Sequence, residues 1–220
     1  MLAEPISPEP LREQAYASFT RKLLEQDIAP GQFVSQRELV EITGMPLGAI
    51  REIIPRLEAD GLIKTVPQRG LQVAHVDLDL IRNAFQLRQM LEREAVMNFC
   101  ATAPEAEIRR IKQDHLEVAT QARHGVTPAL LDRAQRMDWA FHDRMIDALG
   151  NTLISGIYRI NSIKVRLIRL TDTRILPELM TDVMKEHMNI IDALARRNAE
   201  AAAGALEDHI NSAKRRALGI

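Results

Sequence analysis

Four side chains in the C-terminal part of this sequence could together hold a metal ion: Asp138, His142, His187 and His209. The first two are four residues apart in a stretch with helical periodicity, so both project from one helix face. The other two lie on two later helical stretches. Three imidazoles and one carboxylate from three helices could converge on a divalent ion inside a bundle. The alternative is three core histidines satisfied by internal hydrogen bonds.

The composition is that of an ordinary helical globular protein. Of the 220 residues, 46% are apolar, 27% are charged and only 4% are aromatic, which favours helix over sheet. The single cysteine cannot form an intramolecular disulfide, so we expect a reducing, cytoplasmic compartment. We find no stretch of roughly 18 apolar residues that could span a membrane, and the N-terminus does not resemble a signal peptide. Three prolines within residues 1–10 predict a flexible tail there.

The N-terminal third alternates helix, turn and strand patterns. Apolar periodicity and helix-ending turns predict three helices, over residues 11–28, 35–42 and 46–60. Ser35 and Glu38 form a capping-box pattern at the start of the second helix. Two short strands follow, over residues 62–66 and 71–74, with a turn between them. Three helices and a β-hairpin predict a winged helix-turn-helix, whose third helix enters the DNA major groove.

From Asp77 onward every segment has a helical pattern. Six helices are expected, over residues 77–101, 104–124, 127–149, 151–172, 177–196 and 198–217, and six helices of this length form a compact bundle. The predicted fold is therefore mainly α. A winged helix-turn-helix over residues 11–75 is followed by an all-helical domain over residues 76–220.

A series of short motifs runs through residues 11–75: Ala29-Pro30-Gly31, Arg37-Glu38-Leu39, Gly44, Ile50-Arg51-Glu52, the run from Leu57 to Ile63, and Gly70. In their order and spacing they resemble the GntR family of bacterial transcription regulators. The resemblance implies that Arg37, Arg51 and Gly70 contact DNA. Arg69 is adjacent, at the tip of the wing.

One segment departs from that family. The recognition helix usually begins with Ser-Arg-Thr-Pro, whereas this chain has Pro46-Leu47-Gly48-Ala49. Base recognition there is limited to backbone amides and to apolar contacts with thymine methyl groups. Residues 1–75 carry eight basic and ten acidic side chains, which gives a charge of −2. The domain as a whole therefore offers little electrostatic attraction to DNA, which is itself negatively charged. A winged helix used to bind protein is therefore kept as an alternative.

The C-terminal part carries a second series of motifs: Leu87-Arg88-x-x-Leu91-Glu92, Asp138-x-x-Phe141-His142, Gly150-Asn151-x-Leu153, Glu186-His187-x-x-Ile190 and Asp208-His209-Ile210. These resemble the FCD effector-binding domain of the FadR-like branch, and six helices indicate the smaller VanR-like variant. The resemblance implies a divalent metal at Asp138, His142, His187 and His209. It also implies a homodimer that binds a short palindromic operator in double-stranded DNA.

A centre with three histidines and one aspartate leaves one or two coordination positions open. Zn²⁺ is the expected ion, and Ni²⁺ and Mn²⁺ also suit these ligands. A small carboxylate effector could occupy the open positions while Arg88 holds its other end, because a guanidinium forks onto carboxylates. Arg166 and Asn161 are expected to line the same cavity. The remaining histidines, His75, His115 and His124, are predicted to lie at the surface.

The sequence thus predicts a ligand-responsive transcriptional repressor. A metal-dependent enzyme is the first alternative, since an open metal position can activate water. Hydrolysis also needs a general base beside that water. Asp143 and Glu186 are neighbours of the ligands in sequence, but they point away if the histidines point inward. No enzyme activity is therefore expected. A protein-binding scaffold is the second alternative.

Overall fold

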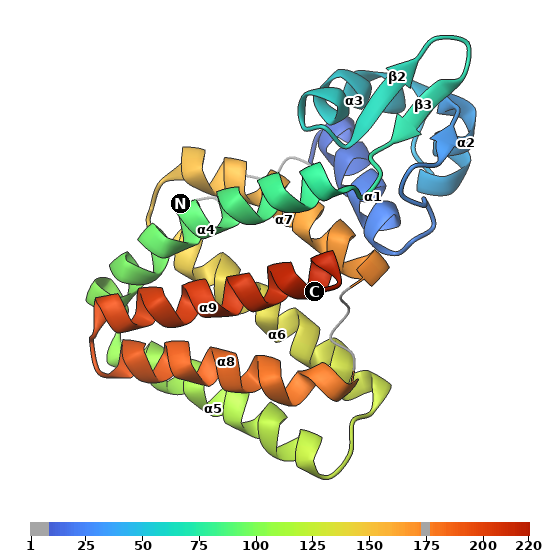
Figure 1. The fold of residues 1–220 in the computed structure, drawn as a ribbon. Coiled ribbons are helices and arrows are strands. Elements are labelled where there is room, and N and C mark those ends of the chain that lie inside the picture. Colours follow the sequence, from blue (N-terminus) through green and yellow to red (C-terminus); the bar gives the residue numbers. More distant parts are fainter. Residues whose placement is uncertain (1–8, 173–176) are drawn as a thin grey trace, which may run out of the picture. The chain divides into compact units, whose positions relative to one another are not determined.

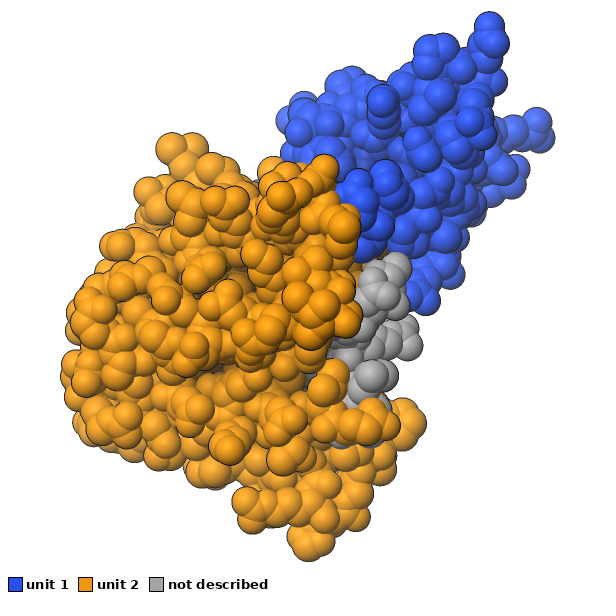
Figure 2. Space-filling model, in the orientation of Figure 1, with its two compact units in different colours: residues 1–77 blue, residues 78–220 orange. Residues whose placement is uncertain are grey.

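The computed structural model describes residues 9–172 and 177–220, without the side chains of residues 169–172 and 177. It divides into two compact units, residues 1–77 and residues 78–220 (Figure 2). Most of the predicted tail, residues 1–10, lies outside the described residues. No described helix is long and apolar enough to cross a membrane.

The first unit contains the three predicted helices, α1 (Leu11–Leu24), α2 (Gln36–Thr43) and α3 (Leu47–Ala59) (Figure 1). The capping box at the start of α2 is formed. Ser35 Oγ accepts a hydrogen bond from the Glu38 N–H at 3.2 Å, and a Glu38 carboxylate oxygen accepts one from the Ser35 N–H at 2.7 Å. These two bonds satisfy backbone donors that the helix itself leaves free. No side chain caps α3 at Pro46, which leaves its first amides open.

The predicted hairpin is present, and a third strand extends it to a three-stranded antiparallel sheet. Strands β2 (Ile63–Val66) and β3 (Gly70–Val73) pair as expected, and β1 (Phe33–Val34) pairs with the other edge of β3. The strand order is β1-β3-β2. The sequence prediction missed β1 because two residues are too few to show an alternating pattern.

Helix α1 also ends earlier than predicted, at Leu24 instead of near Ile28. Gln26 adopts a left-handed conformation with φ +67°, and the Asp27 N–H returns to the Lys22 carbonyl at 3.0 Å. This six-to-one bond closes the helix and turns the chain away from its axis. Ile28 then packs into the core of the first unit as a fully buried loop residue. The apolar pattern that extended the helix prediction therefore belongs to a loop.

The second unit consists of the six predicted helices: α4 (Leu78–Thr102), α5 (Glu105–Arg123), α6 (Pro128–Asp147), α7 (Thr152–Asp172), α8 (Pro177–Ala195) and α9 (Ala199–Leu218). Helix α9 packs against α4 and α8, α8 packs against α5, and α7 packs against α4 (Figure 1). Helix α6 contacts α4, α5, α7 and α8. Residues from α6, α8 and α9 can therefore meet inside the bundle.

The inward faces of three helices combine apolar residues with the predicted ligands. On α6 the buried positions include Ala134, Asp138, Phe141, His142 and Met145, which recur every three or four residues along one helix face. His187 on α8 lies between Met184 and Ile190, and His209 on α9 lies between Leu206 and Ile210, all of them buried. The apolar faces that fold the bundle therefore also carry the polar ligands into its interior.

Candidate functional site

The four predicted ligands meet inside the second unit. Asp138 and His142 from α6, His187 from α8 and His209 from α9 each offer one ligand atom, and these atoms all lie within 4.8 Å of one another. Every one of these residues is at most 2% exposed. His187 Nε2 lies 3.3 Å from an Asp138 carboxylate oxygen. Two ligand atoms that each lie about 2.0–2.2 Å from a shared ion are separated from one another by a distance similar to that between His187 Nε2 and the Asp138 oxygen. The spacing within the group therefore suits a metal ion.

Nε2 of His142 and Nε2 of His209 are buried ring nitrogens of this group that make no hydrogen bond in the part of the chain that the structure describes. Buried polar atoms almost always have a partner. The opposite nitrogen of each ring lies 2.7–2.8 Å from a carboxylate oxygen, so Nε2 is the atom left to bind an ion.

Two carboxylates lie next to the Nδ1 atoms of these rings, on the side away from the other ligands. His142 Nδ1 lies 2.7 Å from Glu92 on α4, and His209 Nδ1 donates to Glu186 on α8 at 2.8 Å. An Nδ1–H directed at a carboxylate leaves the Nε2 lone pair facing inward, which is the usual arrangement around a metal-bound histidine.

The same two carboxylates are themselves held by arginines. Arg88 Nε donates to Glu92 at 2.7 Å, and Tyr158 donates to the same Glu92 oxygen at 3.0 Å. The Arg216 guanidinium lies 3.3–3.4 Å from the Glu186 oxygens. Asp138 is thus the one carboxylate within the group of four, and the charges of Glu92 and Glu186 are balanced on their far sides.

Electrostatics keep the rings neutral and the carboxylates charged. Burial lowers the pKa of His209 to about 4 and also lowers the pKa of His142. Burial opposes ionisation of Glu92 and Glu186, but neighbouring groups outweigh it, chiefly the charge of Arg88 for Glu92 and the hydrogen bond from His209 for Glu186. The pKa of each is lowered to about 2. Neutral imidazoles beside ionised carboxylates are the protonation states that a cation requires.

His115 corrects a prediction, because it is buried and not at the surface. It is 1% exposed and its Nε2 lies 3.2 Å from His187 Nδ1. The signal was present in the sequence, since the buried face of α5 is Ile108, Ile111, His115 and Val118, with the spacing of a helix stripe. The other two histidines outside the ligand set, His75 and His124, are exposed as predicted.

A small cavity of about 20 Å³ adjoins the group, with room for about one water molecule. All three predicted effector residues line it together with two of the ligands; its lining comprises Arg88, Asp138, Trp139, His142, Tyr158, Asn161, Ser162, Val165 and Arg166. The sequence prediction had not included Trp139 or Tyr158, because nothing in the chain order places them beside α4.

Each of the three predicted effector residues also has a structural contact. Arg88 is 3% exposed, and its Nη1 is buried with no hydrogen-bond partner among the described residues. Asn161 donates to the Ala84 carbonyl at 2.9 Å. The Arg166 guanidinium lies 4.4 Å from the centre of the Trp139 ring. The cavity wall therefore presents buried donors beside the metal group.

The two acidic neighbours that an enzyme could use as a base are engaged elsewhere. Asp143 lies 2.7 Å from Arg159 and 3.4 Å from Arg166, and Glu186 sits behind the His209 ring. Neither one is among the residues that line the small cavity.

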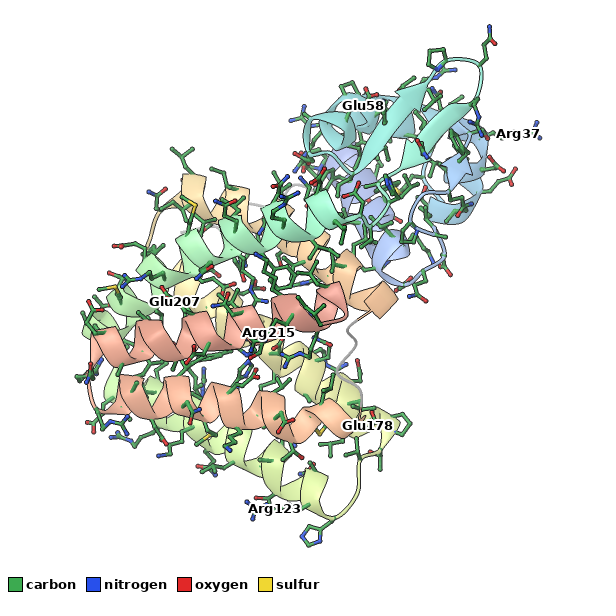
Figure 3. All side chains as sticks on the ribbon, in the orientation of Figure 1. Arg37, Glu58, Arg123, Glu178, Glu207 and Arg215 are labelled. Atoms are coloured by element: carbon green, nitrogen blue, oxygen red, sulfur yellow. The ribbon has the colours of Figure 1, made fainter. Side chains whose placement is uncertain are left out.

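The predicted DNA-contact residues all lie on the surface of the first unit. Arg37 extends from α2 into solvent (Figure 3), with a side chain 91% exposed and a 3.7 Å ion pair to Glu41. Arg51 is exposed on α3, where its Nε donates to the Gln36 side chain at 3.1 Å. Arg69 lies at the wing tip with its guanidinium 4.1 Å from the Phe33 ring centre, and Gly70 begins β3.

Comparison with known proteins covers both units. The family model for bacterial regulatory proteins of the gntR family matches residues 11–73, and the FCD domain matches residues 83–212. The transcriptional repressor RspR of Escherichia coli K12 is 24% identical over 92% of this chain and 86% of its own. The solved structure of Escherichia coli McbR/YncC superposes with a TM-score of 0.73 over 93% of this chain and 95% of its own, at 16% identity.

A solved metal-free FCD domain covers 66% of this chain and 96% of its own, with a TM-score of 0.54 and 21% identity. The curated relatives are transcriptional regulators and not enzymes. The winged helix, the six-helix bundle and the two family matches agree: the chain belongs to the GntR family of bacterial regulatory proteins and is a DNA-binding transcriptional regulator with an FCD domain.

Proposed function

We propose that this regulator holds a divalent metal ion at Asp138, His142, His187 and His209, and that the ion helps to bind a small carboxylate effector. The observation that carries the proposal is that Nε2 of His142 and Nε2 of His209 are buried and make no hydrogen bond to any residue that the structure describes. Their outer nitrogens are held by carboxylates, so both inner lone pairs are directed into the group. Zn²⁺ is the preferred ion for three imidazoles and one carboxylate, and Ni²⁺ and Mn²⁺ remain compatible.

The small cavity supports the effector part of the proposal. A four-ligand set leaves the ion one or two positions, and two of the ligands line the cavity that Arg88 also lines. The buried Arg88 Nη1 has no hydrogen-bond partner within the described ranges of the chain. It is suited to a carboxylate oxygen, because burying a donor unpaired is costly. The volume of about 20 Å³ admits only a water-sized group. A larger acid therefore needs the Arg166 and Trp139 side chains to move.

The first unit would bind the operator DNA. Arg37, Arg51, Arg69 and the backbone at Gly70 are the proposed contacts to DNA, and a homodimer would place two copies on a palindromic operator. We infer repression released by effector, in the cytoplasm where the operator lies. The effector must prefer one arrangement of the two DNA-binding units, because a ligand shifts an equilibrium only through differential affinity.

The metal is tested by elemental analysis of protein purified without an affinity tag. We expect about one equivalent per chain in the native protein or after reconstitution with Zn²⁺. His209→Asn should lose the ion, whereas the exposed control His124→Asn should keep it. A native protein that stays metal-free after reconstitution contradicts the proposal.

DNA binding is tested by fluorescence anisotropy with the intergenic region upstream of the gene. The metal-loaded protein should bind at low salt, and a screen of small carboxylates should identify one that releases it. Arg88→Ala should abolish that response while retaining DNA binding. If the protein fails to bind any upstream DNA at low salt, operator control by this chain is ruled out.

A further inference from the structure

We propose that His115 is a positioning residue of the metal centre. It accepts a hydrogen bond from His187 Nδ1 and thereby fixes the tautomer whose Nε2 can bind the ion. The inference rests on the proposed metal function and deepens it, because it assigns a role to a fourth histidine that lies outside the ligand set.

The direction of the hydrogen bonds follows from a single carbonyl group. His115 Nδ1 lies 2.7 Å from the Ile111 carbonyl oxygen, and a carbonyl can only accept, so His115 Nδ1 carries the proton. A neutral imidazole has one N–H, and His115 Nε2 is therefore an acceptor. At 3.2 Å from it, His187 Nδ1 must donate. His187 Nε2 is then unprotonated on the side that faces Asp138, 3.3 Å away.

The same logic governs the other two ligand histidines, but with different partners. Glu92 stands behind His142 and Glu186 stands behind His209, so both outer N–H groups meet a carboxylate. His115 gives His187 an acceptor without adding a negative charge. The three rings thus share one tautomer, and α5, which supplies no ligand, contributes the third support.

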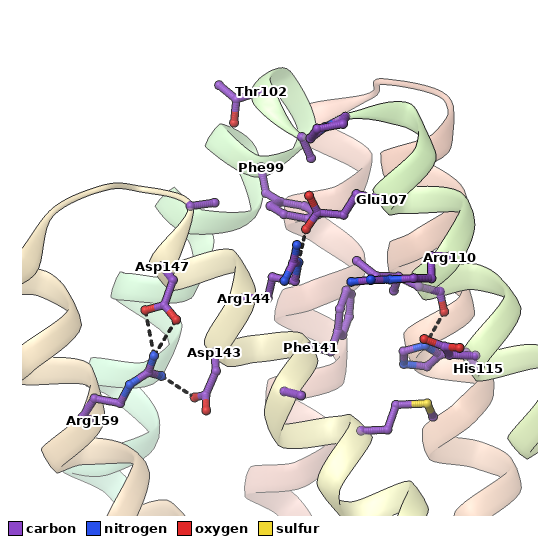
Figure 4. Close-up of a pocket in the computed structure, with 17 residues that line it drawn as sticks. Phe99, Thr102, Glu107, Arg110, His115, Phe141, Asp143, Arg144, Asp147 and Arg159 are labelled. Carbon is purple, nitrogen blue, oxygen red and sulfur yellow. Dashed lines mark hydrogen bonds and ion pairs between the residues drawn. The ribbon is translucent and has the colours of Figure 1, made fainter. Parts of the chain in front are cut away.

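Packing holds His115 in the required orientation. Its ring meets Phe141 edge to face, with centroids 5.3 Å apart and an interplanar angle of 71°, and the Phe141 ring also lies 5.3 Å from His187. His115 also lines a cleft of about 670 Å³, together with Phe141 (Figure 4). The ring therefore forms part of the wall between this cleft and the metal group, and it does not itself reach the ion.

The test compares two substitutions that differ in one property. His115→Phe retains an aromatic ring but has no acceptor, whereas His115→Gln can place its amide oxygen near the position of Nε2. His124→Phe, an exposed histidine at the end of α5, is the matched control. Zn²⁺ affinity is measured by competition with a chromophoric chelator. In the metal-free proteins, ring ¹⁵N shifts report the tautomer of His187, and thermal unfolding checks that each variant is folded.

We expect His115→Phe to bind Zn²⁺ about 10- to 100-fold more weakly, the range for loss of a support behind a metal ligand. His187 should lose its single tautomer in that variant. His115→Gln should recover most of the affinity and the tautomer, and His124→Phe should match the native protein. Native affinity and an unchanged His187 tautomer in folded His115→Phe overturn the inference. Absence of Zn²⁺ binding by the native protein would instead overturn the proposed metal function.

Discussion

At the scale of single residues, the proposed metal centre would depend on groups that do not touch the ion. The three histidines among the proposed ligands are backed by Glu92, Glu186 and His115, and the two carboxylates are fixed in turn by Arg88 and Arg216. Supports of this kind orient a histidine and raise its basicity. Their removal should therefore weaken metal binding without removing a ligand.

Glu186→Gln tests this for His209. The amide has no charge and presents an N–H as readily as an oxygen, so the Nδ1–H of His209 loses its strong acceptor. We expect Zn²⁺ affinity to fall roughly 10-fold or more, measured by chelator competition. Glu178→Gln is the control, because Glu178 is an exposed acid at the start of the same helix (Figure 3). Equal loss in both variants would show that the effect comes from net charge and not from support of His209.

The buried neutral rings also predict how the metal-free protein responds to pH. Burial lowers the pKa of His115 and of His209 to about 4, below the unfolded value of about 6.5. Between these values the unfolded chain binds protons that the folded chain does not, so stability falls as pH decreases and is fully present above pH ~6.5.

Urea unfolding of the metal-free protein at several pH values measures this dependence. We expect a loss on the order of 1 kcal/mol per pH unit between about pH 6 and pH 4 for each such histidine. His115→Phe should have a shallower dependence, because it removes one of the groups. If the free energy of unfolding of the native chain stays constant or rises as the pH is lowered over this interval, the assignment of neutral buried rings is contradicted.

The sequence predicted the four residues that the structure brings together: Asp138 and His142 by their spacing on one helix, and His187 and His209 by the resemblance to the FCD domain. It also contained His115 within an apolar stripe, where the prediction overlooked it. The pairing of Glu92 with His142 and the position of Tyr158 depend on how α4, α6 and α7 pack. Such contacts join residues far apart in the chain, and no periodicity within one segment specifies them.

At the scale of elements, the six bundle helices were predictable and the sheet was only partly so. Long amphipathic stripes and first-turn prolines predict where each of these helices begins and ends to within a residue or two. β1 has two residues and exists only because β3 offers it a free edge. Its pairing also explains Gly70, which has φ +93° and whose added Cβ would lie 3.0 Å from the Val34 carbonyl oxygen.

Gly70→Ala should accordingly destabilise the first unit by about 1–3 kcal/mol, from the strained backbone and from the clash with β1. Gly48→Ala is the matched control, since Gly48 lies in α3 with no atom within 4 Å of its added Cβ. That change should stabilise the helix by about 0.5–1 kcal/mol. Thermal unfolding of the two variants should shift in opposite directions, and two equal shifts would rule out the proposed role of β1.

At the scale of the whole molecule, the near balance of basic and acidic residues limits how the chain can bind DNA. The chain carries a net charge of −1, with 29 basic and 30 acidic residues, so attraction to DNA must come from a few positioned side chains. Arg37 and Arg69 are the candidates for phosphate contacts in the first unit. Each dimer would present two copies of each arginine, and each phosphate contact contributes about one to the slope of log K against log salt.

Arg37→Ala should therefore weaken operator binding at low salt and reduce the magnitude of that slope by about two per dimer. Arg123→Ala is the control, because Arg123 is an exposed arginine at the end of α5 in the second unit (Figure 3). Its removal changes the net charge equally and should leave the slope unchanged. Anisotropy titrations at four or more salt concentrations measure both slopes. If both variants lower the slope alike, DNA responds to the overall charge of the molecule. If only Arg37→Ala lowers the slope, the winged helix positions its few cations on the phosphate backbone of the DNA.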